Sequence, residues 1–243
     1  QLSKHVKLNY LKFYDPAIEF WLIHFLSCIK LRYDKLLKIK NKYNPIYIPD
    51  IDFPKFTFDR TNDFMSCFRN DSINNNYIYQ EIAKIIGIKV IRFDKKIYQK
   101  NYKNYESSNL IKNKIILRLI KILKPNLCID IYNKSKKIRL LNIFKKNKFE
   151  LSSEFLRGFY KKKNKEIKIR IREKNQFDKI VNNFLSEFYP KILFPNVDLI
   201  NNLSKVKKNI KTLSSSIGLI SSDEYRILAK ILKKKQVITY QHG

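Results

Sequence analysis

Apolar residues recur at helical spacing in three long stretches of the chain. The longest covers residues 16–40, and a second covers Phe177 to Tyr189, where Pro190 ends the pattern. Helix-like spacing resumes from Pro195 to about Lys208. The spacing predicts that the first of these helices is long and largely buried.

Two shorter helices are predicted between the first two stretches. Thr61 to Asp63 has the residue types of a helix start, and the helical pattern continues through Phe68. A further helix is predicted from Asn74 to Ile86, and Gly87 is its stop signal. The segment from Asn44 to Pro54 holds too many prolines for a helix, so we expect an extended connection there.

The centre of the chain carries weaker patterns. Ile115 to Leu123 has helical spacing, and Leu127 to Tyr132 has the composition of a strand. Lys136 to Phe144 fits a helix or a strand. Spacing alone therefore does not assign this region.

The pattern is clearest at the end of the chain. Ile210 to Ser215 has the pattern of a strand, Ser222 to Lys234 that of an amphipathic helix, and Gln236 to Tyr240 that of a second strand. A strand–helix–strand unit of this kind places its strands parallel in a covered sheet. The sequence therefore predicts an α/β fold, in which a part that is helical to about residue 209 leads into a βαβ unit at 210–243 and a Rossmann-like parallel sheet.

Composition and charge narrow the choice of partners. The chain has 243 residues, of which 44% are hydrophobic, and its formal net charge is +30. Such a charge favours phosphate-bearing partners, but Lys outnumbers Arg by 41 to 10, which is typical of AT-rich codons, whereas nucleic-acid readers favour Arg. A nucleic-acid partner is therefore disfavoured, although a non-enzymatic Lys-rich nucleic-acid-binding protein remains the alternative interpretation.

Cysteine usage and hydropathy bear on location. Cys28, Cys67 and Cys128 are widely separated, which argues against a disulfide framework or a zinc cluster and fits a reducing cytoplasm. No apolar stretch reaches the roughly 18 residues that a membrane span requires, because Lys or Arg interrupts each candidate. We expect a cytoplasmic protein, for which peripheral contact with an anionic membrane at the inner face of the plasma membrane is allowed.

The leading candidate for chemistry is the end of the chain. His242 follows a predicted strand closely, and open α/β sheets bind ligands at the carboxyl ends of their strands. A histidine there can act as general base toward a hydroxyl or donate a hydrogen bond to a phosphate, and a structural histidine is the alternative. Gln241 and Gly243 would shape the site, and Ser215 and Ser216, at the end of the other strand, can bind substrate through hydroxyl and N–H groups.

Other polar motifs have structural interpretations. Ser221 and Glu224 have the spacing of a capping box, which is favoured over an anion site. Asp50 and Asp52 have the D-x-D spacing that some sugar-nucleotide transferases use for a divalent cation, but prolines surround them, so solvated acids are favoured and no metal site is expected. His24 lies within an apolar helix, where a satisfied histidine is expected. The chain lacks the common glycine-rich dinucleotide and phosphate motifs, and no cofactor is expected.

Four stretches share a likeness to one family. They are Leu8-Asn9 with Phe20–Leu26 and Arg32-Tyr33; Asn62–Phe64 with Asn74–Tyr79; Phe177–Pro195; and the closing βαβ unit with Gln241-His242-Gly243. Together they resemble the bacterial surface-carbohydrate biosynthesis transferases, which are sugar or sugar-phosphate transferases with a GT-B-like architecture. Asn196-Val-Asp198 departs from the acidic tripeptide of that family, and residues from about 88 to 170 match nothing in it.

This resemblance implies a function. Residues 1–243 would be an amino-terminal, acceptor-side domain, with the donor-binding domain beyond residue 243. The implied reaction moves a sugar or sugar-phosphate group from a nucleotide sugar donor to a surface polysaccharide or lipopolysaccharide acceptor, a glycan or lipid-linked molecule of the cell envelope. His242 would be the base or a phosphate contact, whereas Asn9, Trp21 and Asp63 are weaker candidates with structural roles favoured. An inactive interaction protein with the same fold is a further alternative.

Overall fold

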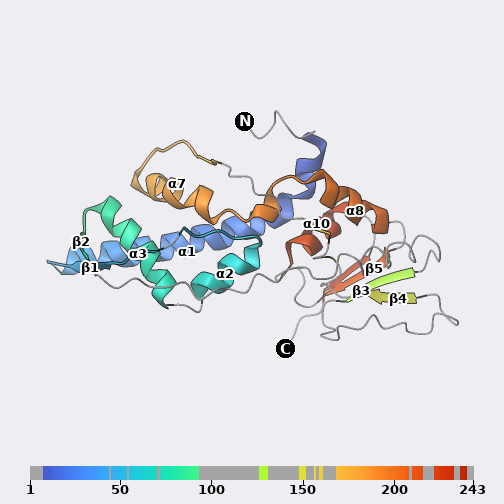
Figure 1. Cartoon of the computed structure of the whole chain (residues 1–243), viewed down its shortest axis with the longest axis horizontal. Coiled ribbons are helices and arrows are strands. Elements are labelled where there is room, and N and C mark those ends of the chain that lie inside the picture. Colours follow the sequence, from blue (N-terminus) through green and yellow to red (C-terminus); the bar gives the residue numbers. More distant parts are fainter. Residues whose placement is uncertain are drawn as a thin grey trace. The chain divides into compact units, whose positions relative to one another are not determined.

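Two compact units make up the chain. The computed structural model describes residues 8–43, 45–53, 55–69, 72–92, 126–130, 148–151, 156, 159–160, 168–207, 210–215, 222–232 and 236–239 (Figure 1). What we call the sheet unit comprises Gln1–Ile18, Tyr105–Lys163 and Ile192–Gly243, and what we call the helical unit comprises Glu19–Asn104 and Asn164–Lys191. The two units are interleaved in the sequence, and the assignment of residues 1–243 to one acceptor-side domain stays a prediction.

The long helix of the helical unit is α1 (Asp15–Lys42), as predicted. Its buried residues recur every turn or two and share one face of the helix: Ala17, Trp21, Phe25, Ile29 and Leu36. Ile23 and Leu31 are 64% and 68% exposed, so they lie outside this face. The helix is therefore buried along one side only, which corrects the expectation that it is largely buried.

The other helices of this unit begin and end at local signals. They are α2 (Thr61–Arg69), α3 (Ser72–Ile86) and α7 (Gln176–Phe188). The Asp63 carboxylate accepts a hydrogen bond from the Arg60 N–H (3.0 Å), and the Asn175 side chain accepts one from the Asp178 N–H (2.9 Å). At the end of α3, Gly87 has φ of 75°, a conformation that glycine adopts without strain. All three predicted helices are confirmed.

An aromatic cluster forms the core of the helical unit. The fully buried ring of Phe188, at the end of α7, lies at its centre. Ring centroids 4.8–6.3 Å from that of Phe188 belong to Phe25, Phe56, Phe58, Phe64, Phe68, Tyr77 and Phe184. Tilted and edge-on contacts between aromatic rings stabilise a core beyond the area that they bury. The cluster therefore joins α1, α2, α3, α7 and the segment that holds Phe56 and Phe58.

Two short strands complete the helical unit. β1 (Tyr47–Asp50) and β2 (Lys89–Arg92) form a parallel pair, with Asp50 opposite Arg92. β1 lies in the proline-rich segment that was predicted to be extended, and Pro49 is tolerated because a strand of a two-stranded sheet has an unpaired edge. β2 was not predicted.

The sheet unit contains a four-stranded parallel sheet. Its strands are β3 (Asn126–Asp130), β4 (Lys148–Leu151), β5 (Ile210–Ser215) and β6 (Gln236–Thr239), in the order β4-β3-β5-β6. β5, α10 (Asp223–Leu232) and β6 confirm the predicted βαβ unit. The prediction that the chain is helical to about residue 209 is wrong in part, because β1 to β4 lie before that residue. Strands of four or five residues show too little alternation of apolar and polar residues to stand out in the sequence. The patterns at 115–123 and 136–144 lie outside the described residues.

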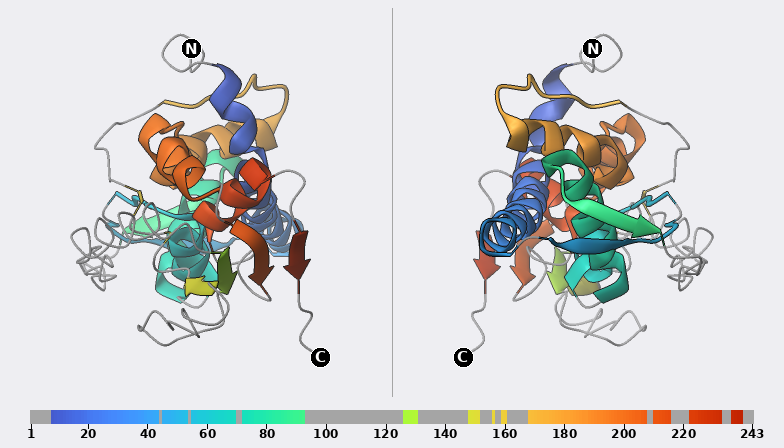
Figure 2. Two further views of the ribbon diagram at one scale, coloured as in Figure 1. Left: turned by 90° about the vertical axis from the view of Figure 1, so that its right-hand side faces the viewer. Right: turned by 90° about the vertical axis from the view of Figure 1, so that its left-hand side faces the viewer.

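Helices cover one side of this sheet. α8 (Val197–Lys207) and α10 pack against each other and lie on the same side of the strands (Figure 2), and α10 also contacts the 3₁₀ helix η2 (Leu8–Phe13). A further 3₁₀ helix, η3 (Lys191–Leu193), precedes α8. The Tyr14 hydroxyl accepts a hydrogen bond from the Asn196 N–H (2.9 Å), and burial raises the pKa of Tyr14 to about 12. Tyr14 therefore links the start of the chain to the start of α8.

The strand register divides the sheet into an apolar and a polar face. Paired residues of parallel strands share a face, and successive residues alternate between faces. One face carries Leu127, Ile129, Phe149, Leu151, Leu213 and Val237, followed by the paired residues Ser215 and Thr239 at the strand ends. The other carries Asn126, Cys128, Asp130, Lys148, Glu150, Thr212, Ser214 and Gln236, with Ile238 as its apolar exception.

Candidate functional site

The strand order indicates where the sheet unit would bind a ligand. β4 follows β3 in the sequence and lies next to it toward one edge strand of the sheet. β5 lies on the opposite flank of β3, and β6 continues in that second direction. Such a reversal is the switch point of a doubly wound sheet, and ligands bind there at the carboxyl ends of the strands. The candidate functional site is therefore the carboxyl edge of the sheet at β3 and β5.

Polar residues stand at this edge. Asp130 is the last residue of β3 and pairs with Ser214 of β5. Ser215 is the last residue of β5 and pairs with Thr239 of β6. The backbone pairing therefore brings the ends of β3, β5 and β6 to one edge of the sheet.

The amino terminus of α10 follows the same edge, and a serine caps it. The Ser222 hydroxyl accepts a hydrogen bond from the Tyr225 N–H (3.2 Å) and donates one to the Glu224 carboxylate (3.1 Å). Ser222 therefore caps α10, whereas the predicted pairing of Ser221 with Glu224 involves a residue outside the described residues and stays a prediction.

Charged side chains are buried at this helix start. Asp223 and Arg226 form an ion pair of 2.7 Å, with side chains 1% and 3% exposed. Burial lowers the pKa of Arg226, and the nearby Asp223 and Glu224 carboxylates oppose this shift. Two carboxylates beside one guanidinium leave excess negative charge at a helix end that would otherwise favour an anion. We therefore assign no phosphate site to the amino terminus of α10.

Of the predicted site residues, the structure describes the backbone of Ser215, which ends β5 at this edge. Ser216, Gln241, His242 and Gly243 lie outside the described residues. β6, which leads toward His242, pairs with β5 on the side away from β3. His242 thus follows a strand that is one position removed from the switch point, and its role stays a prediction.

Sequence reasoning missed Asp130. The signal available was an acid at the end of the apolar run Leu-Cys-Ile, within a stretch that was predicted as a strand. What gives Asp130 its importance is the place of β3 between β4 and β5, and strand order cannot be read from local spacing.

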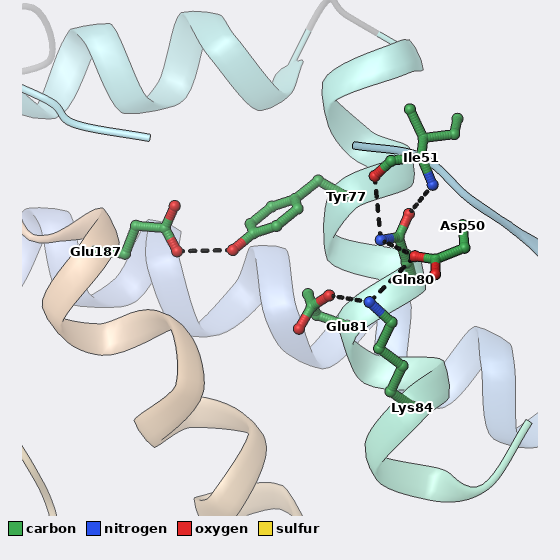
Figure 3. A network of polar contacts seen from close by, with 7 residues as sticks. All are labelled: Asp50, Ile51, Tyr77, Gln80, Glu81, Lys84 and Glu187. Carbon is green, nitrogen blue, oxygen red and sulfur yellow. Dashed lines mark hydrogen bonds and ion pairs between the residues drawn. The ribbon is translucent and has the colours of Figure 1, made fainter. Parts of the chain in front are cut away.

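A separate polar network in the helical unit involves the D-x-D motif (Figure 3). Asp50 accepts a hydrogen bond from Gln80 Nε2 (2.6 Å) and lies 3.2 Å from Lys84 Nζ, which also pairs with Glu81 (2.8 Å). Burial lowers the pKa of Lys84, but its hydrogen bonds to Glu81 and Asp50 outweigh this effect and raise it. Asp50 is therefore engaged in fixing β1 to α3. Among the side chains that the structure describes, no group of three or more His, Cys, Asp or Glu could hold a metal ion.

Glu187 of α7 extends this network toward the aromatic core (Figure 3). Its carboxylate accepts hydrogen bonds from the Tyr77 hydroxyl (2.7 Å) and from the Phe56 N–H (2.7 Å). Burial raises the pKa of Glu187 by more than these hydrogen bonds lower it, and burial together with the Glu187 charge raises the pKa of Tyr77. These contacts tie three segments of the helical unit together, so we interpret Glu187 as structural.

The weaker sequence candidates are structural where the structure describes them. His24 Nδ1 lies 2.8 Å from the Phe20 carbonyl oxygen, and its ring packs on that of Phe20. Trp21 is buried against Phe25, and Asp63 caps α2. The side chain of Asn9 lies outside the described residues. The described helices include none with the length and apolar character needed to cross a membrane.

Comparison with known proteins gives one match. A family model described as LIC12162 family transferase matches residues 5–243. No curated protein and no solved structure matches the chain. The family match covers both units, including the whole of the described sheet.

Proposed function

Because the chain belongs to the LIC12162 family of transferases, we propose that it moves a sugar or sugar-phosphate group from a nucleotide-activated donor to a surface polysaccharide or lipopolysaccharide acceptor. The active site in this proposal is the carboxyl edge of the sheet at β3 and β5. The observation that carries it is the strand order β4-β3-β5-β6, which puts a switch point between Asp130 and Ser214–Ser215 in a chain of a transferase family.

The chemistry of this transfer has two requirements that the edge can meet. A base must take the proton of the acceptor hydroxyl, and hydrogen-bond donors must offset the charge that develops on the departing phosphate. Carboxylate and imidazole groups supply the first, and the hydroxyl and backbone N–H groups of Ser215 and Ser216 supply the second. No cofactor takes part in this proposal.

The proposed architecture is GT-B-like, with the sheet unit as a Rossmann-like domain on the acceptor side. Four parallel strands in doubly wound order, with α8 and α10 on one side, support it. The net charge of +30 supports peripheral contact with an anionic membrane, where a lipid-linked acceptor would be found.

A donor panel tests the proposal. The purified native protein is incubated with uridine, guanosine and cytidine nucleotide sugars and an acceptor extract, and the released nucleotide is measured. We expect release with one class of donor, and a higher KM for that donor in Ser215→Ala. A protein that neither releases nucleotide from any donor nor is stabilised by one against heat, but binds RNA with a steep salt dependence, would support the basic nucleic-acid-binding alternative instead.

A further inference from the structure

We propose that one end of the helical unit is a docking surface for an anionic lipid bilayer. The surface consists of Tyr43, Tyr47, Ile91, Lys42 and Lys89, and we call it the tyrosine–lysine surface. Its three large apolar side chains, Tyr43, Tyr47 and Ile91, are 55%, 50% and 42% exposed. Single exposed apolar residues are common, whereas a group of them marks a contact surface. This inference specifies where the membrane contact of the proposed function lies, and it does not depend on the transfer reaction.

Two parts of the helical unit form this surface. The last turn of α1 and the strands β1 and β2 lie at the same end of the unit (Figure 1). Lys40 Nζ donates a hydrogen bond to the Ile86 carbonyl oxygen, which ties the last turn of α1 to the chain just before β2. Tyr43 follows α1 directly, and Tyr47 is the first residue of β1. All five residues of the surface belong to the helical unit.

The strand register shows which side of β1 and β2 contributes. Tyr47 pairs with Lys89 and Pro49 pairs with Ile91, so these four residues share one face of the strand pair. The other face carries Ile48, which is only 8% exposed, and both strands contact α3. The face with Tyr47 and Ile91 is therefore the outer one.

Each tyrosine of the surface has a lysine ammonium beside its ring. Lys42 Nζ lies 5.2 Å from the ring centroid of Tyr43, and Lys89 Nζ lies 5.7 Å from that of Tyr47. At a bilayer, aromatic rings with a polar tip lie at the level of the headgroups, and lysine stems lie along apolar surface while the ammonium reaches the phosphate groups. The two pairs have the chemistry for such a position.

The charge of this end complements an anionic lipid surface. Besides the two lysines of the surface, Lys38 is exposed one turn before the end of α1. The acid of the strand pair, Asp50, lies on the opposite face and forms an ion pair with Lys84. Each Lys or Arg near an anionic bilayer strengthens binding about fivefold. Positive charge and exposed apolar area therefore coincide here.

Single-stranded nucleic acid is the other anionic partner that tyrosine and lysine side chains bind. Its bases stack on the open faces of aromatic rings, and Arg adds cation–π contacts. At the tyrosine–lysine surface each ring already carries a lysine ammonium, both cations are Lys, and Ile91 has no ring on which a base could stack. An aliphatic side chain beside tyrosine and lysine fits the boundary between headgroups and acyl chains better. These observations favour lipid.

Vesicle co-sedimentation of the native protein tests this surface. We expect binding to phosphatidylcholine vesicles that contain about 30% phosphatidylglycerol, and little binding to pure phosphatidylcholine. Ile91→Thr and Lys89→Gln should each lower the partition coefficient about fivefold, and Tyr47→Thr combined with Ile91→Thr should lower it about tenfold or more. Threonine is favoured in strands, so the Tm of these variants should stay within about 2 °C of the wild type.

Two matched controls are available. Ile23→Thr makes the same change at an isoleucine that is 64% exposed and lies 19 residues before the end of α1, which is about 28 Å along the helix. Lys205→Gln removes the same charge from an exposed lysine of α8, in the sheet unit. Both controls should bind anionic vesicles within about twofold of the wild type.

A loss of binding confined to the variants of the tyrosine–lysine surface supports the proposal. An equal loss in the controls would mean that net charge alone attracts the vesicles, which overturns it, as does the absence of binding to anionic vesicles. Binding of single-stranded RNA that weakens in Tyr47→Thr, without vesicle binding, would assign the surface to nucleic acid instead. The assay contains no nucleotide sugar, so its failure leaves the transferase proposal standing, and failure of the donor panel does not change its result.

Discussion

The stability of the helical unit should depend on pH through Glu187. Its carboxylate is half-buried and accepts hydrogen bonds from the Tyr77 hydroxyl and the Phe56 N–H, each 2.7 Å long. Burial raises the pKa of Glu187 above its usual value of 4.5, and the two hydrogen bonds recover only part of that shift. The folded protein therefore holds this proton more tightly than the unfolded chain.

The sign of the effect follows from proton linkage. A carboxyl group with a raised folded-state pKa contributes stability that is fully present below its unfolded pKa and is lost as the pH rises through its folded pKa. Between these two values the folded state binds one more proton than the unfolded state. The free energy of unfolding then falls by about 1.4 kcal/mol per pH unit within that window because of this group alone.

Glu187→Gln removes the titration and keeps the shape of the side chain. Its amide oxygen can still accept from the Phe56 N–H, and its amide nitrogen can donate to the Tyr77 hydroxyl oxygen. We expect the unfolding free energy of the variant, relative to the wild type, to rise with a slope of about 1.4 kcal/mol per pH unit above pH 4.5 and then to level off.

Urea denaturation of both proteins from pH 4 to about pH 8 measures this difference, and other titrating groups cancel in the comparison. Glu19→Gln is the control for an acid-to-amide change at the surface, because Glu19 is exposed on α1. A difference for Glu187→Gln that does not change with pH, or that falls as the pH rises, would refute the burial argument.

Three further changes test the packing and the helix ends. Phe188→Ala removes the ring at the centre of the aromatic cluster and should lower the unfolding free energy by about 3–5 kcal/mol, measured by urea denaturation, whereas a loss below about 1 kcal/mol would contradict a packed core. In Gly87→Ala the added Cβ has Lys40 Nζ as its nearest neighbour, at 4.0 Å, so the backbone strain of alanine at φ of 75° should by itself lower the unfolding free energy by about 1–2 kcal/mol. An unchanged unfolding free energy in the same assay would exclude that backbone conformation. Ser222→Ala removes the cap of α10 and should cost about 0.5–2 kcal/mol, seen as a lower Tm, while Ser204→Ala on α8 serves as a control with little expected effect.

Helices with a sustained apolar stripe were the most predictable part of the fold. α7 buries one face, whereas α10 is buried around most of its circumference, and in both helices the apolar residues at helical spacing are visible without any partner. β2 and β4 have four residues each and mix charged with apolar side chains, so nothing in their local sequence separates them from loops. Their pairing with β1 and β3 depends on contacts far apart in the chain, which local spacing cannot express.

The candidate site shows the same limit. Ser215 was predicted because a strand and a serine-rich turn adjoin it in the sequence. Asp130 was missed because 79 residues separate β3 from β5, and only their pairing brings Asp130 beside Ser214. Local pattern thus identifies the ends of strands, whereas the choice of the strand that matters requires the order of the sheet.

The interleaving of the two units leads to a test of the whole scheme. The segments of the helical unit enter the sequence before β3 and between β4 and β5, so the order of the sheet strands does not depend on them. The proposed site at Ser215 belongs to the sheet unit, whereas Phe188 and Glu187 belong to the helical unit. Ser215→Ala should therefore raise the KM for the nucleotide sugar donor with little change in Tm, and Glu187→Gln should change stability with pH while that KM stays near the wild-type value. If Glu187→Gln instead raised the KM as strongly as Ser215→Ala, the helical unit would have to take part in donor binding.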